Sequence, residues 1–107
     1  MQIGLAIHHT VAIDAVFTAL ADTRRRQLLE TLATQGPTSA SSLATQWDIS
    51  RQAIAKHLTI LERADLVERT RVGREVCFVV NANQLGATGR WLTRNAARWQ
   101  QMSSSTD

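Results

Sequence analysis

The stretch Ser50–Leu61 (SRQAIAKHLTIL) carries side chains that can donate hydrogen bonds from one surface of a predicted helix. Ile54, Leu58 and Leu61 recur at spacings of four and three residues, which predicts a single apolar stripe. At about 100° per residue, the opposite face carries Gln52, Ala55, Lys56 and Thr59, with Arg51 and His57 at the borders of the stripe. The face has no acidic side chain. Because such donors suit DNA base edges and phosphates, we predict a recognition helix.

The residues before this helix predict an N-cap and a second, shorter helix, which together would fix its position. Ser50 is the expected N-cap, because its hydroxyl can accept a hydrogen bond from a backbone N–H of the first turn. A shorter helix is predicted from Thr38, as its N-cap, to about Gln46, and the chain turns at Asp48. Two short helices joined by such a turn form a helix-turn-helix pattern, here over residues 38–61.

The residues after this helix predict a β-hairpin over residues 66–80. Segments 66–70 and 75–80 flank the sequence Arg71-Val-Gly-Arg74, and Gly73 can take the positive φ of a tight turn. Arg69 precedes this tip. A hairpin with arginines at its tip, next to a helix-turn-helix, is a wing, from which arginines can reach phosphates or the minor groove. The alternative is a surface hairpin made soluble by its charges.

Two outer helices flank the DNA-reading elements, and the terminal one is predicted to form a dimer interface. Residues 10–20 contain Val11 and Val16, and residues 84–102 contain Leu85, Leu92 and Trp99 at seven-residue spacing. The DNA-reading elements do not need this aromatic-rich terminal helix. We therefore expect it to pack against the first helix and against a second copy of the chain. Burial within one chain is the alternative.

A helix predicted from Thr23 to Gln35 opens with Arg24, Arg25 and Arg26, where the helix dipole disfavours cations. This cluster needs either a structural partner or a phosphate nearby, and we favour the structural reason because three neighbours cannot face one ligand. Gly36 and Pro37 end that helix.

The length of 107 residues favours a single domain spanning residues 1–107. We expect it to be cytoplasmic, because the sequence shows neither a signal peptide nor a membrane span. Of the net charge of +3, residues 1–50 contribute 3 − 4 = −1 and residues 51–107 contribute 9 − 5 = +4. A basic second half is typical of nucleic-acid binders. No signal peptide, membrane span or catalytic constellation is visible, so we predict neither a membrane protein nor an enzyme.

Few residues could serve a metal or redox sensor. His8, His9, His57 and the single cysteine, Cys77, are the soft ligands of the chain. His8 and His9 are adjacent, which is poor geometry for chelation, and Cys77 falls within the predicted hairpin, which favours a packed, inert thiol. We therefore expect no metal and no cofactor. A repressor responding to metal or thiol chemistry through His8, His9 and Cys77 remains the alternative.

Taken together, these motifs resemble the ArsR/SmtB-like winged-helix transcriptional repressors over roughly residues 17–99. The similar segments are ALADTRRRQLLE (19–30), Leu43-Ala44, SRQAIAKHL (50–58) and RVGR (71–74). The resemblance implies a mainly α fold of five helices plus a two-stranded wing. It also implies a homodimer, formed by the first and last helices, that binds a pseudo-palindromic operator on double-stranded DNA and represses its own operon.

By position, the resemblance assigns DNA contacts to several groups of residues. Gln52 could pair with adenine, and Arg51 with guanine or phosphate. Thr38, Ser39 and Ser41 could hold a phosphate at a helix N-terminus. The full predicted set is Thr38, Ser39, Ser41, Ser50, Arg51, Gln52, Ala55, Lys56, His57, Thr59, Arg69, Arg71 and Arg74. His57 could be a half-buried structural residue that also touches a phosphate.

The chain departs from the family pattern in ways that matter. Asp48 and Asp65 stand where glycine is usual, and Thr23 where proline is usual. Aspartate tolerates turn conformations, so we expect the fold to be kept. Both of the family's recognised metal motifs are missing from this sequence. We therefore predict a DNA-binding regulator whose effector is unknown, with a winged-helix protein-interaction module as the rival hypothesis.

Overall fold

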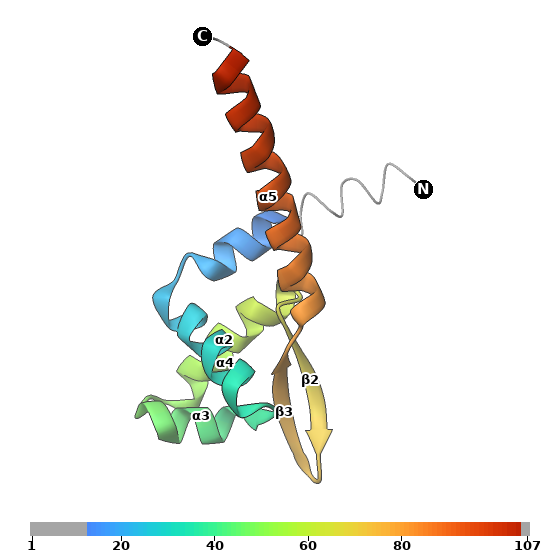
Figure 1. Cartoon of the computed structure of the whole chain (residues 1–107). Coiled ribbons are helices and arrows are strands. Elements are labelled where there is room, and N and C mark those ends of the chain that lie inside the picture. Colours follow the sequence, from blue (N-terminus) through green and yellow to red (C-terminus); the bar gives the residue numbers. More distant parts are fainter. Residues whose placement is uncertain (1–12, 106–107) are drawn as a thin grey trace.

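The computed structural model describes residues 13–105, which form a mainly α-helical fold with a small sheet (Figure 1). Residues 13–20 are helical. They are followed by α2 (Thr23–Gln35), β1 (Thr38–Ser39), α3 (Ala40–Trp47), α4 (Arg51–Arg63), β2 (Val67–Val72), β3 (Glu75–Val80) and α5 (Ala82–Ser105). The predicted hairpin and helices are therefore confirmed, except for the start of the first helix, which lies outside the described residues. No helix in this part of the chain is both long and apolar enough to cross a membrane.

The sheet has a third strand that the sequence did not predict. β1 pairs antiparallel with β3, Thr38 opposite Phe78 and Ser39 opposite Cys77, so the strand order is β1-β3-β2. The prediction of Thr38 as a helix N-cap was wrong, because Ser39 takes that place and its Oγ accepts from the N–H of Ser42 at 3.1 Å. Thr38 is instead buried, and its hydroxyl donates to the Gly36 carbonyl at 2.8 Å.

The predicted apolar stripe of α4 lies at the centre of the core. Ile54, Leu58 and Leu61 are each at most 1% exposed. Around them pack Leu28 and Leu32 of α2, Leu43 of α3, Leu66, Val67 and Phe78. Since α4 is held from three sides, its polar face has a fixed orientation relative to the sheet.

Both aspartates that replace the family's usual glycine adopt left-handed backbone conformations. Asp48, at the end of α3, has φ 53°, and Asp65, after α4, has φ 59°. Aspartate is among the few residues with a side chain that visit this region readily. The two turns that place α4 are therefore kept, as predicted. Gly73 at the hairpin tip has φ 62°, which the tight turn requires.

The terminal helix α5 extends away from the rest of the molecule, beside the first helix at its base (Figure 1). It starts two residues before the predicted position and ends three residues beyond it. The rings of Phe17 and Trp91 meet edge to face, with centroids 5.8 Å apart. This contact confirms the predicted packing of the first helix against the last.

Burial divides the residues predicted to form the dimer interface. Leu92 and Trp99 are 47% and 58% exposed, so their apolar surface is open, whereas Leu85 packs partly on the core. Val16 is fully buried in the core of its own chain, so its assignment to the dimer interface was wrong. The adjacent Phe17 is exposed. Val11 lies outside the described residues.

The arginines that open α2 have structural partners. Arg25 donates from Nε to the Ala19 carbonyl at 2.8 Å and from Nη2 to the Thr18 carbonyl at 3.1 Å. Arg26 donates to the Leu20 carbonyl and to the Thr23 hydroxyl. These carbonyls lie at the C-terminal end of the preceding helix, where backbone acceptors lack the usual i→i+4 helical partner and the helix dipole favours cations. The structural reason favoured from the sequence is therefore confirmed for Arg25 and Arg26.

Asp22 is the N-cap of α2 and makes stability dependent on pH. The backbone N–H groups of Arg25 and Arg24 donate to its carboxylate, at 3.2 and 2.8 Å. The first of these bonds is the main cause that lowers the pKa of Asp22 below its ordinary 3.8. A lowered folded-state pKa stabilises the protein above the unfolded-state value, and this stabilisation is lost as the pH falls through the folded-state pKa.

We therefore expect Asp22→Asn to flatten the acid side of the stability profile. Asparagine keeps the capping acceptor but does not titrate. Urea unfolding midpoints measured in steps from about pH 5 to about pH 2 should fall less steeply for this variant than for wild type. Parallel profiles would show that the Asp22 cap contributes nothing to acid sensitivity.

Candidate nucleic-acid interface

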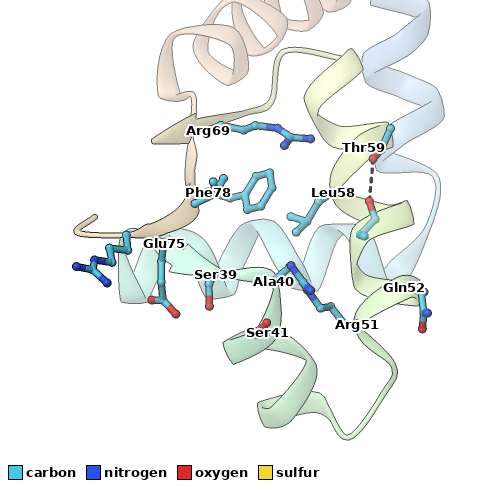
Figure 2. Close-up of a pocket in the computed structure, with 13 residues that line it drawn as sticks. Ser39, Ala40, Ser41, Arg51, Gln52, Leu58, Thr59, Arg69, Glu75 and Phe78 are labelled. Atoms are coloured by element: carbon cyan, nitrogen blue, oxygen red, sulfur yellow. Dashed lines mark hydrogen bonds between the residues drawn. The ribbon is translucent and has the colours of Figure 1, made fainter. Parts of the chain in front are cut away.

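A groove of about 690 Å³ lies between the start of α3, the exposed face of α4 and the hairpin. Its wall includes Leu58 of α4 and Phe78 of β3, and Figure 2 shows their side chains facing each other. Eight of the predicted DNA-contacting residues line it: Ser39, Ser41, Arg51, Gln52, Ala55, Thr59, Arg69 and Arg74. The fold thus brings together side chains that three separate segments of the sequence supply.

The α4 face presents the predicted donors to solvent. Arg51, Gln52, Ala55 and Lys56 are exposed. Ser50 is the N-cap, as predicted, and its Oγ accepts from the N–H of Ala53 at 3.1 Å. Thr59 is half-buried, and its hydroxyl donates to the Ala55 carbonyl at 2.9 Å (Figure 2). Because its proton is used in this bond, the hydroxyl oxygen can serve a binding partner mainly as a hydrogen-bond acceptor.

His57 lies at the border of the α4 stripe, half-buried. Its Nδ1 is 3.5 Å from Nη1 of Arg25, and because an arginine can only donate, Nδ1 is the acceptor. The expectation of a half-buried, hydrogen-bonded structural residue is therefore confirmed. The same Arg25 caps the first helix and lies 3.8 Å from the Asp22 carboxylate, so it links three helices at one point.

The start of α3 forms the second side of the groove. Ser39 is the cap of α3, and Ser41 is exposed in its first turn. Arg51 of α4 and Ala40 at the start of α3 line the same groove (Figure 2), so a guanidinium shares this space with the helix N-terminus. A helix N-terminus with an adjacent cation is a favourable place for an anion such as a phosphate. Thr38 has no part in this surface, because it is buried in β1.

The hairpin forms the third side of the groove. Arg71 and Arg74 are exposed near its tip, as predicted, but only Arg74 lines the groove. Arg69 behaves differently, because both its Nε and its Nη2 donate to the Glu62 carboxylate, at 2.7 and 3.1 Å. Its guanidinium carbon also lies 5.4 Å from the centre of the Phe78 ring. The Glu62 carboxylate raises the pKa of Arg69 above its ordinary value.

Three residues at or beside the groove were not among the predicted site residues: Glu62, Glu75 and Val76. Glu75 and Val76 line the groove, so its surface is less uniformly basic than predicted. The signal for Glu62 was an acidic residue at the end of α4 and an arginine seven positions later. The turn through Asp65 brings them together, and spacing alone does not show this.

No cluster of three or more His, Cys, Asp or Glu side chains able to hold a metal ion is found within residues 13–105. Cys77 is buried, at 4% exposure, on the strand that pairs with both β1 and β2. His8 and His9 lie outside the described residues.

Comparison with known proteins agrees with this geometry. A helix-turn-helix domain family matches residues 20–70. The transcriptional repressor SdpR of Bacillus subtilis is 31% identical over 80 residues, covering 75% of this chain and 88% of SdpR. An ArsR-like transcriptional regulator from Rhodococcus sp. RHA1 is 40% identical and has a TM-score of 0.84, with 92% of each chain covered.

A further solved structure is the homodimeric winged helix-turn-helix DNA-binding domain of a Mycobacterium bovis protein. It is 25% identical, with a TM-score of 0.68, covering 86% of this chain and 83% of that one. SdpR and the Rhodococcus protein are each more than 30% identical to this chain over more than two thirds of its length, and the two solved structures have the same fold. The chain therefore belongs to the ArsR family of winged helix-turn-helix, DNA-binding transcriptional regulators.

Proposed function

We propose that the protein binds a pseudo-palindromic operator as a homodimer and represses transcription from it, including transcription of its own gene. The observation that carries this proposal is the groove itself, in which α3, α4 and the hairpin present hydrogen-bond donors to one space. The resemblance to SdpR, a repressor, supports the direction of regulation. Such a regulator acts on DNA in the cytoplasm and needs no enzymatic activity.

The proposed contacts follow from the position of each element. In this proposal α4 enters the major groove, where Arg51, Gln52 and Lys56 meet base edges or phosphates and Ala55 allows close approach. Ser39 and Ser41 bind the phosphate backbone at the start of α3. Arg71 and Arg74 on the hairpin contact flanking phosphates or the minor groove.

The proposed dimer uses the open face of α5. Leu92 and Trp99 lie seven residues apart along this helix and leave apolar surface exposed. The similar Mycobacterium bovis domain is a homodimer. A two-fold symmetric protein pairs with a two-fold symmetric site, and its two recognition helices are expected to enter major grooves about one helical turn apart. We propose residues 1–107 as one domain, with its dimerisation helices at residues 10–20 and 84–102.

Selection from a pool of random duplexes tests the proposed operator. We expect the recovered duplexes to contain two inverted half-sites spaced by about one turn of DNA. Recovery of a single unrepeated motif would contradict the two-fold arrangement, and recovery of no motif would contradict specific recognition.

Replacing Gln52 and Arg74 separately should produce two different kinds of loss. Gln52→Ala should cost about 1–3 kcal/mol at one base pair of each half-site and relax the preference there. Arg74→Ala should weaken all duplexes similarly and lower the salt slope of log K by about 1 per subunit. Titrations of the selected duplex and its single-base variants at several salt concentrations would measure both. A uniform loss for Gln52→Ala would remove it from the base contacts.

A further inference from the structure

We propose that Arg69 and Glu62 form a clamp that fixes the hairpin against the recognition helix, so that Arg69 positions the hairpin and does not itself recognise DNA. The proposal rests on the proposed DNA-binding function, since it assigns a role within the same groove. It changes the role of a residue that the sequence placed among the DNA contacts.

The geometry of the contact supports the clamp. The Nε and Nη2 groups of Arg69 donate to the two oxygens of Glu62, at 2.7 and 3.1 Å, which is the two-pronged arrangement that fixes a guanidinium plane. The same guanidinium lies over the ring of Phe78, with its central carbon 5.4 Å from the ring centre. Phe78 is opposite Arg69 in the β2–β3 register, so the side chain is held by its own hairpin and by α4.

The position of the clamp along the hairpin gives it a mechanical consequence. β3 is held by its pairing with β1 at Cys77 and Phe78. On β2, Val67 packs in the core beside the α4 stripe, and Arg69, two residues nearer the tip, adds a side-chain ion pair with Glu62 of α4. After the half-buried Thr70, residues 71–76 are all exposed and include both tip arginines. The clamp therefore lies at the base of a projecting tip and sets how far Arg71 and Arg74 stand from the α4 face.

Removal of the Glu62 charge distinguishes a structural clamp from a purely electrostatic effect on DNA binding. Glu62 places a negative charge at the edge of a surface that faces DNA in the proposed function. If electrostatics alone mattered, removal of that charge would strengthen binding. If the clamp matters, the same removal frees the hairpin and weakens specific binding. Glu62→Gln therefore gives opposite signs for the two models.

The test compares three variants on the duplex recovered by selection. Glu62→Gln and Arg69→Lys should each weaken specific binding by about three- to tenfold, the second because lysine keeps the charge but loses the fork and the stacking. Glu68→Gln is the matched control, because Glu68 is an exposed acid on β2 whose side chain, one position before Arg69, lies on the opposite face of the strand. It should bind as wild type or more tightly. Tighter binding by Glu62→Gln would overturn the clamp.

Amide hydrogen exchange of the free protein tests the clamp without DNA. Exchange at residues 67–80 should be faster in Glu62→Gln and Arg69→Lys than in wild type, and unchanged in Glu68→Gln. If wild type shows no preference for any duplex, the proposed operator function fails on that result alone, and the exchange rates still decide whether the clamp exists. Unchanged exchange in both clamp variants would overturn the clamp, whatever the protein binds.

Discussion

Replacing Leu92 and Trp99 together with glutamate is expected to make the protein monomeric and to weaken operator binding on the order of a hundredfold. These residues expose 47% and 58% of their surface in the single chain, so two acids there leave the core intact. In a dimer interface, however, they would face the same charges from the second copy. Binding would then lose the advantage of two linked half-sites.

Light scattering and DNA titration of the same preparations would measure this effect. The matched control is Ala97→Glu with Gln101→Glu, two exposed positions on the side of α5 away from Leu92 and Trp99. The control adds the same charge and should remain dimeric. If the Leu92/Trp99 variant is dimeric as well, the contact between subunits uses another surface.

Replacing Leu58 with alanine is expected to destabilise the protein by about 2–5 kcal/mol. Leu58 is 1% exposed on the inner face of α4, and its side chain lies opposite Phe78 at the wall of the groove. Truncation leaves a cavity where the recognition helix meets the sheet. Since a domain of this size is stable by only about 5–15 kcal/mol, a large part of its stability depends on this one contact.

Urea unfolding at a fixed protein concentration would measure the loss, because dimerisation makes the midpoint depend on concentration. Val72→Ala is the control: Val72 is 52% exposed near the hairpin tip and should change stability by less than about 0.5 kcal/mol. A loss below about 1 kcal/mol for Leu58→Ala would mean that α4 is not held through this position.

The sequence predicts the parts of the fold that local chemistry determines. The periodicity of Ile54, Leu58 and Leu61 and the cap at Ser50 locate α4, and its buried stripe is as predicted. Gly36 followed by Pro37 marks the end of α2, whose bounds Thr23–Gln35 are confirmed. Each of these signals lies within one turn of the element that it defines, so no knowledge of distant contacts is needed.

The features that were missed depend on partners far along the chain. β1 is two residues long and exists because β3, about forty residues later, pairs with it. Thr38 was therefore assigned to a helix start, although its neighbour Ser39 is the cap. Val16 was assigned to the dimer surface because an apolar residue on an outer helix can face either the core or a partner. Its full burial shows that it faces the core.

The candidate site was predictable in its residue types but not in its internal contacts. The exposed donors Arg51, Gln52 and Lys56 follow from helix periodicity. The pairing of Arg69 with Glu62 and of Arg25 with His57 requires the three-dimensional arrangement. A count of basic residues therefore overestimates the number of side chains free to meet DNA.

The most direct test of the central claim is a gel shift with the wild-type protein and the DNA upstream of its own gene. We expect a discrete complex that competes out with unlabelled specific duplex, survives an excess of a scrambled duplex of the same composition, and weakens steeply with salt. Equal competition by the scrambled duplex, or no complex at low salt, would contradict sequence-specific recognition by α4.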